Sequence, residues 1–404
     1  MDDPGNGPLA GIRVLDCGQL IAGGMLGMLL GDFGADVIKV EHPGPGDPLR
    51  SFGRRRGSVP LYWKHLSRNK RSITLALNRE EGQALFRQLV AKVEPDVVIE
   101  SFRPGTLERW GLGPDVLGAI RPGLIVARVS GFGQTGPYRE RPGFGTLAES
   151  MSGFAHMTGQ RDGPPTLPPI ALADSIAALY GTVGVLLALR ARDTPGGPPV
   201  LVVDASLLDS LFSLLGNQLI EYDQLGIIAG RDGNRAPTSA PRNLFATRDD
   251  HWVAIVAPTP NVFDRLLNAI GHPELASDPR FSSNEARLEN VEALDAVIAE
   301  WAAQRSRDDI LDLLVAAEVP VAPVADMAAL AVDPHLLARE MVVSVDDPDL
   351  GRVRMPGIVP RLPQTPGSIR SSAPAHGSSN EEVYSTMLGL PSSEIARLKS
   401  SGTI

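Results

Sequence analysis

The chain has 404 residues and a formal net charge of −9, from 38 Lys and Arg against 47 Asp and Glu. This length suffices for two or three domains with a real core, and the negative balance argues against a protein whose main task is binding nucleic acid. The single cysteine, Cys17, excludes an internal disulfide and a cysteine-based zinc or iron–sulfur site. Cys17 lies in the apolar run IRVLDCG, so we expect a buried, small hydrophobic side chain.

Targeting and membrane-spanning segments are not evident in the sequence. The N-terminus, MDDPGNGPLAG, has neither the charged start nor the apolar stretch of a signal peptide. No run of 18 uncharged apolar residues occurs, and the apolar residues 20–30 are too few to span a bilayer. We therefore expect a soluble, cytoplasmic protein with no membrane partner and no nucleic-acid partner.

The first third of the chain alternates between short apolar runs and helical stretches. The first apolar run is Ile12–Asp16, and a glycine-rich helix over Ala22–Phe33 and the run DVIKVEH follow it. The pattern recurs in SITLAL, the helix EEGQALFRQLVAKV, DVVIESF, the helical stretch around TLERWG, and LIVARVSGF. Repeated strand–helix alternation predicts an α/β fold, with a parallel sheet covered by helices on both faces.

The pattern changes in the second half of the chain. We expect a helix over Asp174–Arg192, the strand PVLVVD, a long helix over Ala205–Leu225 and then a linker, RDGNRAPTSAPRN. From about residue 243 to residue 326, a hairpin with Asp249 and Asp250 at its turn and three helices indicate a smaller α+β unit. The remaining residues predict the strand pair MVVSVDD and GRVRMPGIV, a loose segment, SSAPAHGSS, and a last helix, SSEIARLKS.

Common cofactor motifs are missing or misspaced. The first strand–helix turn invites a dinucleotide-binding interpretation, but its glycines do not form G-x-G-x-x-G. Gly23, Gly27 and Gly31 instead form a small-residue stripe suited to close helix packing. There is no P-loop, no G-x-S-x-G and no H-E-x-x-H, and the seven histidines include no i, i+4 pair. We therefore expect no metal site, and a flavin or nicotinamide oxidoreductase remains only an alternative that a bound chromophore would reveal.

Basic residues cluster locally despite the negative total. Because ligands of parallel sheets bind at the carboxyl ends of the strands, clusters near predicted strand ends suggest a compact polyphosphate ligand. A solvated surface is the ordinary alternative for any one cluster. The three clusters are Arg54, Arg55 and Arg56; Lys64, Arg68, Lys70 and Arg71; and Arg103 with Arg109.

Several segments, in their order and spacing, resemble those of the family III CoA-transferases, which include CoA-transferases for oxalate, carnitine, benzylsuccinate and dicarboxylates, with the α-methylacyl-CoA racemases as relatives. The segments are PLAGIRVLD, FGADVIKVEHPGPGD, RNKRSITLAL, ESFRPGTLERWGLG, SGFGQTGPYRERPGFG, ALADSIAALYGTVGVLLAL, GNRAPTSAP, RFSSNEARLENVEAL and VPVAPVADM. The resemblance implies a large Rossmann-like domain built from both chain ends, a small inserted domain and an interlocked homodimer. The expected limits are 8–225 for the first part of the large domain, 226–332 for the linker and small domain, and 333–404 for the return.

The resemblance also assigns the site residues. Asp174, which by itself suits the first turn of a helix, matches the family's catalytic aspartate and is the expected nucleophile. His42 stands where some members carry Arg, so Arg54–Arg56 are expected to compensate. The implied partners are an acyl-CoA and a carboxylic acid, with CoA as substrate and no tightly bound cofactor. The expected CoA-contacting residues are Ile21, Ala22, His42, Leu75, Asn78, Ser101, Phe102 and Arg109.

The implied chemistry starts from an ionised Asp174, so a strongly raised pKa of this residue would count against the role. The carboxylate attacks the thioester to give an acyl-aspartyl anhydride, the CoA thiolate converts this to an aspartyl-CoA thioester, and an acceptor carboxylate takes the CoA. Backbone amides of residues 131–136 are candidate oxyanion donors. We expect succinyl-CoA and a dicarboxylate as the substrate pair, with Arg54–Arg56, Arg139 and Arg141 as candidate cations; an apolar pocket would instead suit an aromatic or branched acid.

Two alternatives within this fold remain. An α-methylacyl-CoA racemase needs a second acid–base group, but Phe144 occupies the position of the racemase histidine, and His156 lies twelve residues further on. A non-catalytic acyl-CoA-binding protein would keep the fold without turnover, although the aspartate is present.

Overall fold

The computed structural model describes residues 7–194 and 198–404. The chain divides into two compact units, the first formed by Met1–Ala155, Leu167–Ile228 and Leu337–Ile404 and the second by His156–Thr166 and Ala229–Leu336. Both ends of the chain thus contribute to one unit. The segment 156–166, which the sequence placed in the large domain, groups with the second unit. The predicted domain limits otherwise stay a prediction.

The first unit is built on a six-stranded sheet in the order β5-β2-β1-β6-β7-β8. All neighbouring pairs are parallel, which confirms the prediction of a parallel sheet. Apart from the exposed Arg13 at the start of β1, its two central strands are buried, because helices cover both faces, and this explains their runs of Val, Ile and Leu. The strands are β1 (Arg13–Cys17), β2 (Asp36–Glu41), β5 (Lys70–Thr74), β6 (Val97–Glu100), β7 (Leu124–Ser130) and β8 (Val200–Ser206).

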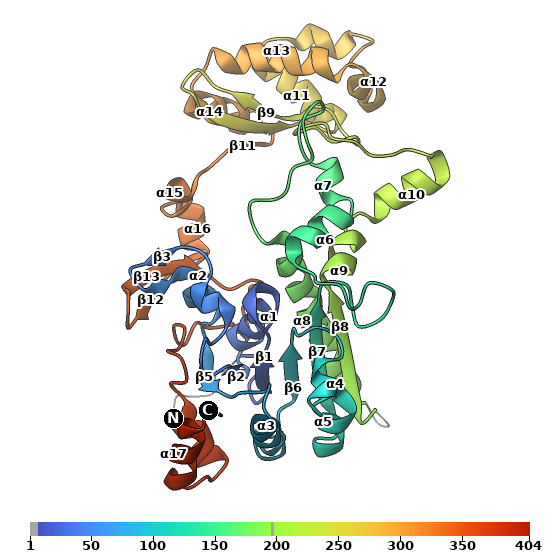
Figure 1. The fold of residues 1–404 in the computed structure, drawn as a ribbon. Coiled ribbons are helices and arrows are strands. Elements are labelled where there is room, and N and C mark those ends of the chain that lie inside the picture. Colours follow the sequence, from blue (N-terminus) through green and yellow to red (C-terminus); the bar gives the residue numbers. More distant parts are fainter. Residues whose placement is uncertain (1–6, 195–197) are drawn as a thin grey trace. The chain divides into compact units, whose positions relative to one another are not determined.

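Helices pack around this sheet (Figure 1), and two hydrophobic clusters take alternate residues of its strands, one on each face. One contains α3 (Glu80–Val93), α5 (Pro114–Ile120) and α17 (Ser392–Ser400), and the other contains α1 (Leu20–Asp32), α8 (Leu172–Arg192) and α9 (Leu207–Ser213). The C-terminal segment is tied to the sheet, since the Tyr384 hydroxyl donates a 2.7 Å hydrogen bond to the Thr74 carbonyl. Cys17 is buried at the end of β1, as predicted, and burial raises the pKa of its thiol.

Two predicted helices differ from the observed ones. The helix expected over Ala205–Leu225 is instead the end of β8, then α9, then α10 (Gly216–Leu225). Strand β8 runs on to Ser206, whose hydroxyl accepts the Asp209 N–H and so begins α9 as a separate helix. Helix α8 begins at Leu172, two residues earlier than expected, which leaves Asp174 inside its first turn.

The smaller elements complete the first unit and the connections. Strands β12 and β13 pair antiparallel, which confirms the predicted strand pair, and β3 pairs with β4 in a short hairpin. These elements are η1 (Pro48–Ser51), β3 (Arg55–Arg56), β4 (Val59–Pro60), α2 (Leu61–Leu66), α4 (Thr106–Arg109), α6 (Gly145–Met151), α7 (Phe154–Met157), α16 (Pro334–Ala338), β12 (Val342–Asp347), β13 (Gly351–Pro356) and η3 (Glu382–Met387).

The second unit is a small α+β fold, as predicted. Its three-stranded antiparallel sheet has the order β11-β10-β9, and Asp250 at the β9–β10 turn has a positive φ of 59°. Arg287, in the helix over Asn284–Glu289, is buried. Its guanidinium donates to the Ala240 carbonyl at 2.7 Å and lies over the Phe263 ring. The elements are β9 (Arg242–Ala246), β10 (Trp252–Val256), α11 (Pro260–Ile270), η2 (Pro273–Ser277), α12 (Asn284–Glu289), α13 (Val291–Ala303), α14 (Arg307–Ala316), β11 (Val321–Pro323) and α15 (Met327–Leu330).

Helix α8 is the one helix of the described residues that is long and apolar enough, by length and composition, to cross a membrane. Its residues Ala173, Ala177, Ala178 and Val185 are fully buried in the cluster that joins α1, α9 and the sheet. One face of the helix therefore packs in the core of the first unit, whereas apolar residues on the rest of it, such as Leu179, Val183 and Leu187, are exposed.

Candidate active site

The glycine stripe of α1 serves close packing, as predicted. A Cβ on Gly23 would lie 2.7 Å from the Gly18 α-carbon, and one on Gly27 would lie 2.6 Å from the Asp16 carboxylate. Only glycine permits these approaches, because any side chain would overlap backbone or a buried carboxylate. The turn after β1 is thereby held tightly against the sheet.

The basic cluster of Lys64, Arg68, Lys70 and Arg71 does not form a ligand site, which corrects the sequence interpretation. Each of these cations is paired with a carboxylate of the chain. The pairs with Lys70 and Arg68 are fully buried, because the cations are needed to neutralise carboxylates in the core. The partners are Asp347 and Asp349 for Lys64, Asp32 for Arg68, Asp16 for Lys70, and Asp36 with Glu382 for Arg71.

The residues predicted to contact CoA, apart from Arg109, follow directly on the carboxyl ends of four neighbouring strands, β5, β2, β1 and β6. Leu75, Ile21 and Ala22 are buried as whole residues, so their predicted contact with CoA stays a prediction. Asn78 is exposed. The residues are Ile21 and Ala22 after β1, His42 after β2, Leu75 and Asn78 after β5, and Ser101 and Phe102 after β6.

Hydrogen bonds between these connections fix their conformations. The Ser101 hydroxyl accepts the Gln19 N–H at 2.7 Å, which joins the turn after β6 to the turn after β1. The His42 Nδ1 atom accepts the Gly44 N–H at 3.0 Å, and the His376 ring contacts the His42 carbonyl at 3.0 Å. The His42 ring is thus engaged in shaping its own turn.

Arg54, Arg55 and Arg56 are exposed on the short β3–β4 hairpin. Arg55 donates to the Arg50 carbonyl at 3.0 Å, and Arg56 donates to the Leu350 carbonyl at 3.3 Å. These contacts engage carbonyl groups, and among the described residues the structure shows no carboxylate in an ion pair with either guanidinium group. Their expected compensation for His42 stays a prediction.

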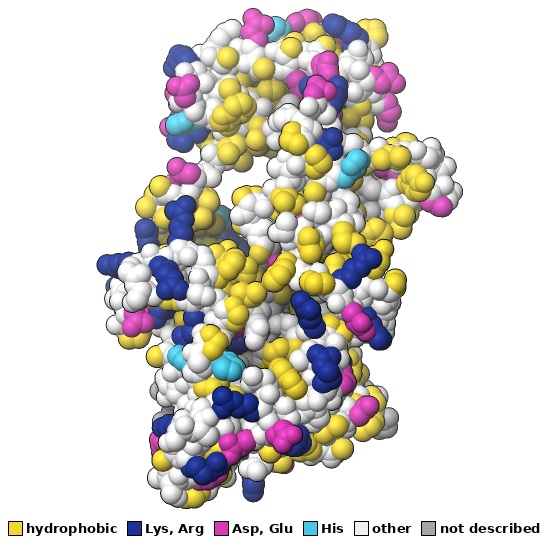
Figure 2. Space-filling view, viewed as in Figure 1, with side chains coloured by type: hydrophobic (Ala, Val, Ile, Leu, Met, Phe, Trp, Pro, Cys, Tyr) yellow, Lys and Arg dark blue, Asp and Glu magenta, His cyan; other side chains and the backbone are white. Residues whose placement is uncertain are grey.

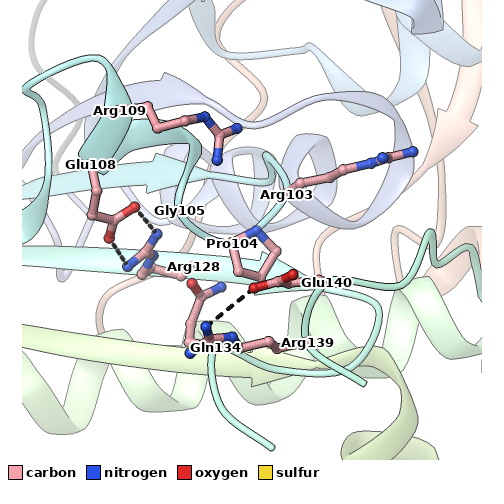
Figure 3. Close-up of a pocket in the computed structure, with 9 residues that line it drawn as sticks. All are labelled: Arg103, Pro104, Gly105, Glu108, Arg109, Arg128, Gln134, Arg139 and Glu140. Carbon is pink, nitrogen blue, oxygen red and sulfur yellow. Dashed lines mark hydrogen bonds and ion pairs between the residues drawn. The ribbon is translucent and has the colours of Figure 1, made fainter. Parts of the chain in front are cut away.

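A basic pocket of about 550 Å³ lies beside α4 and the segment after β7 (Figure 3). Arg109, predicted to contact CoA, is one of its walls, together with Arg103 from the same basic cluster. Arg128 and Gln134 were not predicted. The position of Arg128 within the apolar run LIVARVS was a signal for this residue in the sequence, because a buried arginine requires anionic partners. The lining residues are Arg103, Pro104, Gly105, Glu108, Arg109, Arg128, Gln134, Arg139 and Glu140.

Two carboxylates hold Arg128 in the wall of this pocket. Its Nε donates to Glu100 Oε1 at 2.7 Å and its Nη1 donates to Glu108 Oε1 at 2.7 Å. Burial raises the pKa of Glu100 to about 7, against the lowering effect of Arg128. Among the described residues, the Arg109 guanidinium hydrogen-bonds the Thr106 hydroxyl at 2.9 Å and interacts electrostatically with Glu108, and Arg109 is exposed. Arg109 is therefore better placed than Arg128 to pair with an incoming anion.

One loop connects the basic pocket to Asp174. Residues 131–143 leave β7, contribute Gln134, Arg139 and Glu140 to the pocket, and return where Gly143 packs on Gly131. A Cβ on Gly131 would lie 2.7 Å from the Gly143 α-carbon, so the loop is closed at its base. Gly145, two residues beyond that closure, contacts Asp174.

Two amides of this loop are already occupied, contrary to their predicted role as oxyanion donors. The Gly133 N–H donates to the Ser130 hydroxyl at 3.1 Å, and the Gln134 N–H donates to Asp204 at 2.8 Å. The loop needs these bonds to hold its shape, because a chain reversal leaves its amides without strand partners. These two amides are not available for an oxyanion in this conformation.

Asp174 is the third residue of α8, and its half-buried carboxylate lies directly against the backbone of Gly145. A Cβ on Gly145 would lie 2.1 Å from Asp174 Oδ2, so only glycine leaves room for the carboxylate there. Burial, with a smaller contribution from the nearby Glu149 carboxylate, raises the pKa of Asp174 to about 6. At pH 7 about nine-tenths of the molecules would still carry an ionised Asp174. The raised pKa is thus compatible with a nucleophilic role at neutral pH.

Replacement of Asp174 by Asn is expected to stabilise the protein in a pH-dependent way. Because folding raises the pKa of Asp174, its stability contribution is present below the unfolded-state value of 3.8 and is lost as the pH rises to about 6. The gain in unfolding free energy from Asp174→Asn should therefore be greater at pH 7.5 than at pH 4.5, by about 1–2 kcal/mol. Urea denaturation at both pH values measures the difference, and equal gains would contradict the raised pKa.

Comparison with known proteins assigns the family. The family model described as CoA-transferase family III matches residues 9–380. Two Chloroflexus aurantiacus proteins are each 44% identical to this chain over 98% of both sequences: a succinyl-CoA–D-citramalate CoA-transferase and the beta subunit of a succinyl-CoA–L-malate CoA-transferase. The crystal structure of a CaiB/BaiF family protein from Brucella suis has a TM-score of 0.83 and 34% identity, and covers 95% of this chain and 100% of its own. This chain therefore belongs to CoA-transferase family III.

Proposed function

We propose that this CoA-transferase moves CoA from succinyl-CoA to a small dicarboxylate, with Asp174 as the nucleophile. The observation that carries the proposal is the Asp174 carboxylate, held in the first turn of α8 directly against the backbone of Gly145. The substrate pair is supported by relatives at 44% identity that are named for succinyl-CoA with citramalate or malate. Another relative, 37% identical, is named an acetyl-CoA:oxalate CoA-transferase from Acetobacter aceti, so the named acceptor differs among relatives.

The reaction proceeds through two exchanges at Asp174. The carboxylate attacks the succinyl thioester carbonyl, the carbon–sulfur bond breaks, and CoA leaves as thiolate with a succinyl-aspartyl anhydride on the protein. The thiolate attacks the aspartyl carbonyl, which releases succinate and leaves aspartyl-CoA. The acceptor carboxylate attacks this thioester to give a second anhydride, and the thiolate then attacks the acceptor's carbonyl and frees Asp174. Each step exchanges one acyl bond, so no external redox equivalent is needed.

The basic pocket is the site we propose for the phosphates of CoA. Four arginines and two glutamates line it, which leaves a net positive wall, and guanidinium groups suit phosphate oxygens. The loop of residues 131–143 joins this pocket to the Gly145 contact with Asp174. This one continuous segment can thus contact both the phosphate end and the reactive end of a ligand.

Arg109→Ala is expected to weaken CoA binding by about 1–3 kcal/mol, because it removes one charge-assisted contact to phosphate. Isothermal titration with CoA measures the loss. Arg190→Ala is the matched control, since Arg190 is an exposed arginine in the last turn of α8, outside the pocket. Equal affinities of the two variants would contradict the assignment of the pocket.

The racemase alternative lacks a suitable second group in the first unit. Phe144, immediately before Gly145, is 64% exposed and carries no titratable atom. Glu149, whose charge raises the pKa of Asp174, is itself buried and accepts backbone hydrogen bonds. A two-base proton transfer across a substrate α-carbon has no evident pair of groups here.

We propose that the protein works as a homodimer. All ten residues of α10 lie outside the core, and hydrophobic side chains cover much of this helix (Figure 2). An apolar surface of this kind is typical of an interface. The exposed apolar residues include Leu219, Ile220, Tyr222 and Leu225 on α10 and Leu179, Val183 and Leu187 on α8.

A coupled exchange assay tests the proposed function. Purified protein is mixed with succinyl-CoA and a panel of acids that contains malate, citramalate, mesaconate and oxalate, and the CoA thioesters are separated by chromatography. Formation of a dicarboxyl-CoA with release of succinate is expected. Transfer from acetyl-CoA alone, or to monocarboxylic acids only, would contradict the proposed substrate pair.

A further inference from the structure

Helix α8 begins without a capping side chain. Its N-cap residue is Ala171, which has no side-chain acceptor for the first amides of the helix. The Leu172 and Ala173 amides precede Asp174 directly, and Ala173 is fully buried. Buried amides at a helix start require acceptors, and a missing acceptor leaves the first turn free to shift.

Glu149 supplies that acceptor from another helix. Its Oε1 atom accepts the Leu172 N–H at 3.1 Å and the Ala173 N–H at 3.3 Å. The Leu172 N–H is shared with the Ile170 carbonyl, 2.9 Å away, whereas the structure shows Glu149 as the acceptor for Ala173. Glu149 is 3% exposed, so its carboxylate faces the protein interior and is not part of the open surface.

Gly145 and Glu149 act from the same side of α6. They are four residues apart in a helix, so both face α8. Gly145 leaves the space that the Asp174 carboxylate fills, and Glu149 ties the two amides just before it. One short helix therefore sets both the location of the carboxylate and the position of the turn that carries it.

We propose that Glu149 is a positioning residue for Asp174, which it orients by capping the first turn of α8 without touching substrate. The proposal rests on the proposed function, since it assumes that Asp174 is the reacting group. It assigns Glu149 a second, electrostatic effect as well, because its negative charge opposes ionisation of Asp174. Charged residues on the other elements packed against α8 are Asp32 on α1, Arg128 on β7, Asp204 on β8 and Asp209 on α9, and none of them contributes to the shift.

Two variants separate the two effects. Glu149→Gln keeps an oxygen acceptor and removes the charge, so the acid limb of the kcat/KM profile should move about half a pH unit or more below its wild-type position near pH 6. Glu149→Ala removes the acceptor, so kcat should fall about ten- to hundred-fold at pH 8 with KM for succinyl-CoA within two-fold. Ser150→Ala, on the exposed side of the same helix, is the matched control and should match the wild type in both measurements.

A titration that needs no turnover completes the test. Carbon-13 NMR of Asp-labelled protein follows the Asp174 carboxyl, identified by its loss in Asp174→Asn, in the wild type and in Glu149→Gln. A lower midpoint in Glu149→Gln supports the proposal, and identical midpoints together with an unchanged pH–rate profile overturn it, whether or not Glu149→Ala folds. A further outcome is a midpoint that is lower in Glu149→Gln than in the wild type while the wild-type protein transfers no CoA. That result would overturn the proposed function and leave the positioning of Asp174 by Glu149 supported.

Discussion

Asp174→Ala is expected to lower the rate of CoA transfer by at least about a thousand-fold, because it removes the carboxylate proposed to form the covalent intermediate. The affinity for CoA should stay within a few-fold of the wild-type value, since the basic pocket draws its residues from other segments. Steady-state exchange assays and titration with CoA measure the two quantities. The contrast between lost turnover and retained binding is the signature of a nucleophile.

Asp174→Asn is the control for a steric effect, since the amide keeps the shape of the side chain against Gly145. It should be as inactive as Asp174→Ala and at least as stable as the wild type at pH 7.5. Substantial turnover by either variant would contradict the covalent mechanism. A parallel loss of CoA affinity in both would indicate instead that Asp174 supports the binding site.

Arg68→Ala is expected to lower the free energy of unfolding by about 3–5 kcal/mol. The Arg68 guanidinium donates to both Asp32 oxygens, with the shortest contact at 2.6 Å, and both side chains are almost fully buried. Burial already raises the pKa of Asp32 with Arg68 in place. Removal of the cation leaves a carboxyl group that must bind a proton or remain charged without its main partner.

Arg71→Ala is the matched comparison for this prediction. Arg71 belongs to the same basic segment, but its ion pairs with Asp36 and Glu382 are partly exposed to solvent. Exposed pairs contribute little, so its loss should be about 1 kcal/mol or less. Urea denaturation of both variants provides the test, and a loss from Arg68→Ala no larger than that from Arg71→Ala would contradict the structural role of Arg68.

The parallel sheet could be predicted because its strands are apolar runs separated by helices, and the second unit because its hairpin has a clear turn at Asp250. The start of α9 at Leu207 could not, since the cap at Ser206 depends on where β8 ends. Local patterns therefore indicated the elements, and contacts decided their ends.

The resemblance of their segments predicts Asp174 and Arg109 as site residues, and their roles stay predictions. Arg109 lines the basic pocket. The segment that holds Arg68 and Lys70 was misinterpreted, because the carboxylates that pair with it lie 30 or more residues away along the chain. The sequence gives no indication that Glu149 is buried beside Asp174, because a glutamate in a short helix ordinarily faces solvent.

The most direct test of the account is mass spectrometry of the intact protein after mixing with succinyl-CoA and trapping with hydroxylamine. Hydroxylamine cleaves an activated aspartyl group and leaves an aspartyl hydroxamate, which peptide mapping locates. If Asp174 is the nucleophile, a modification at Asp174 is expected that requires succinyl-CoA and is absent from Asp174→Asn. A protein that exchanges CoA at full rate and shows no modification at Asp174, or shows it at another residue, would contradict the covalent role of Asp174.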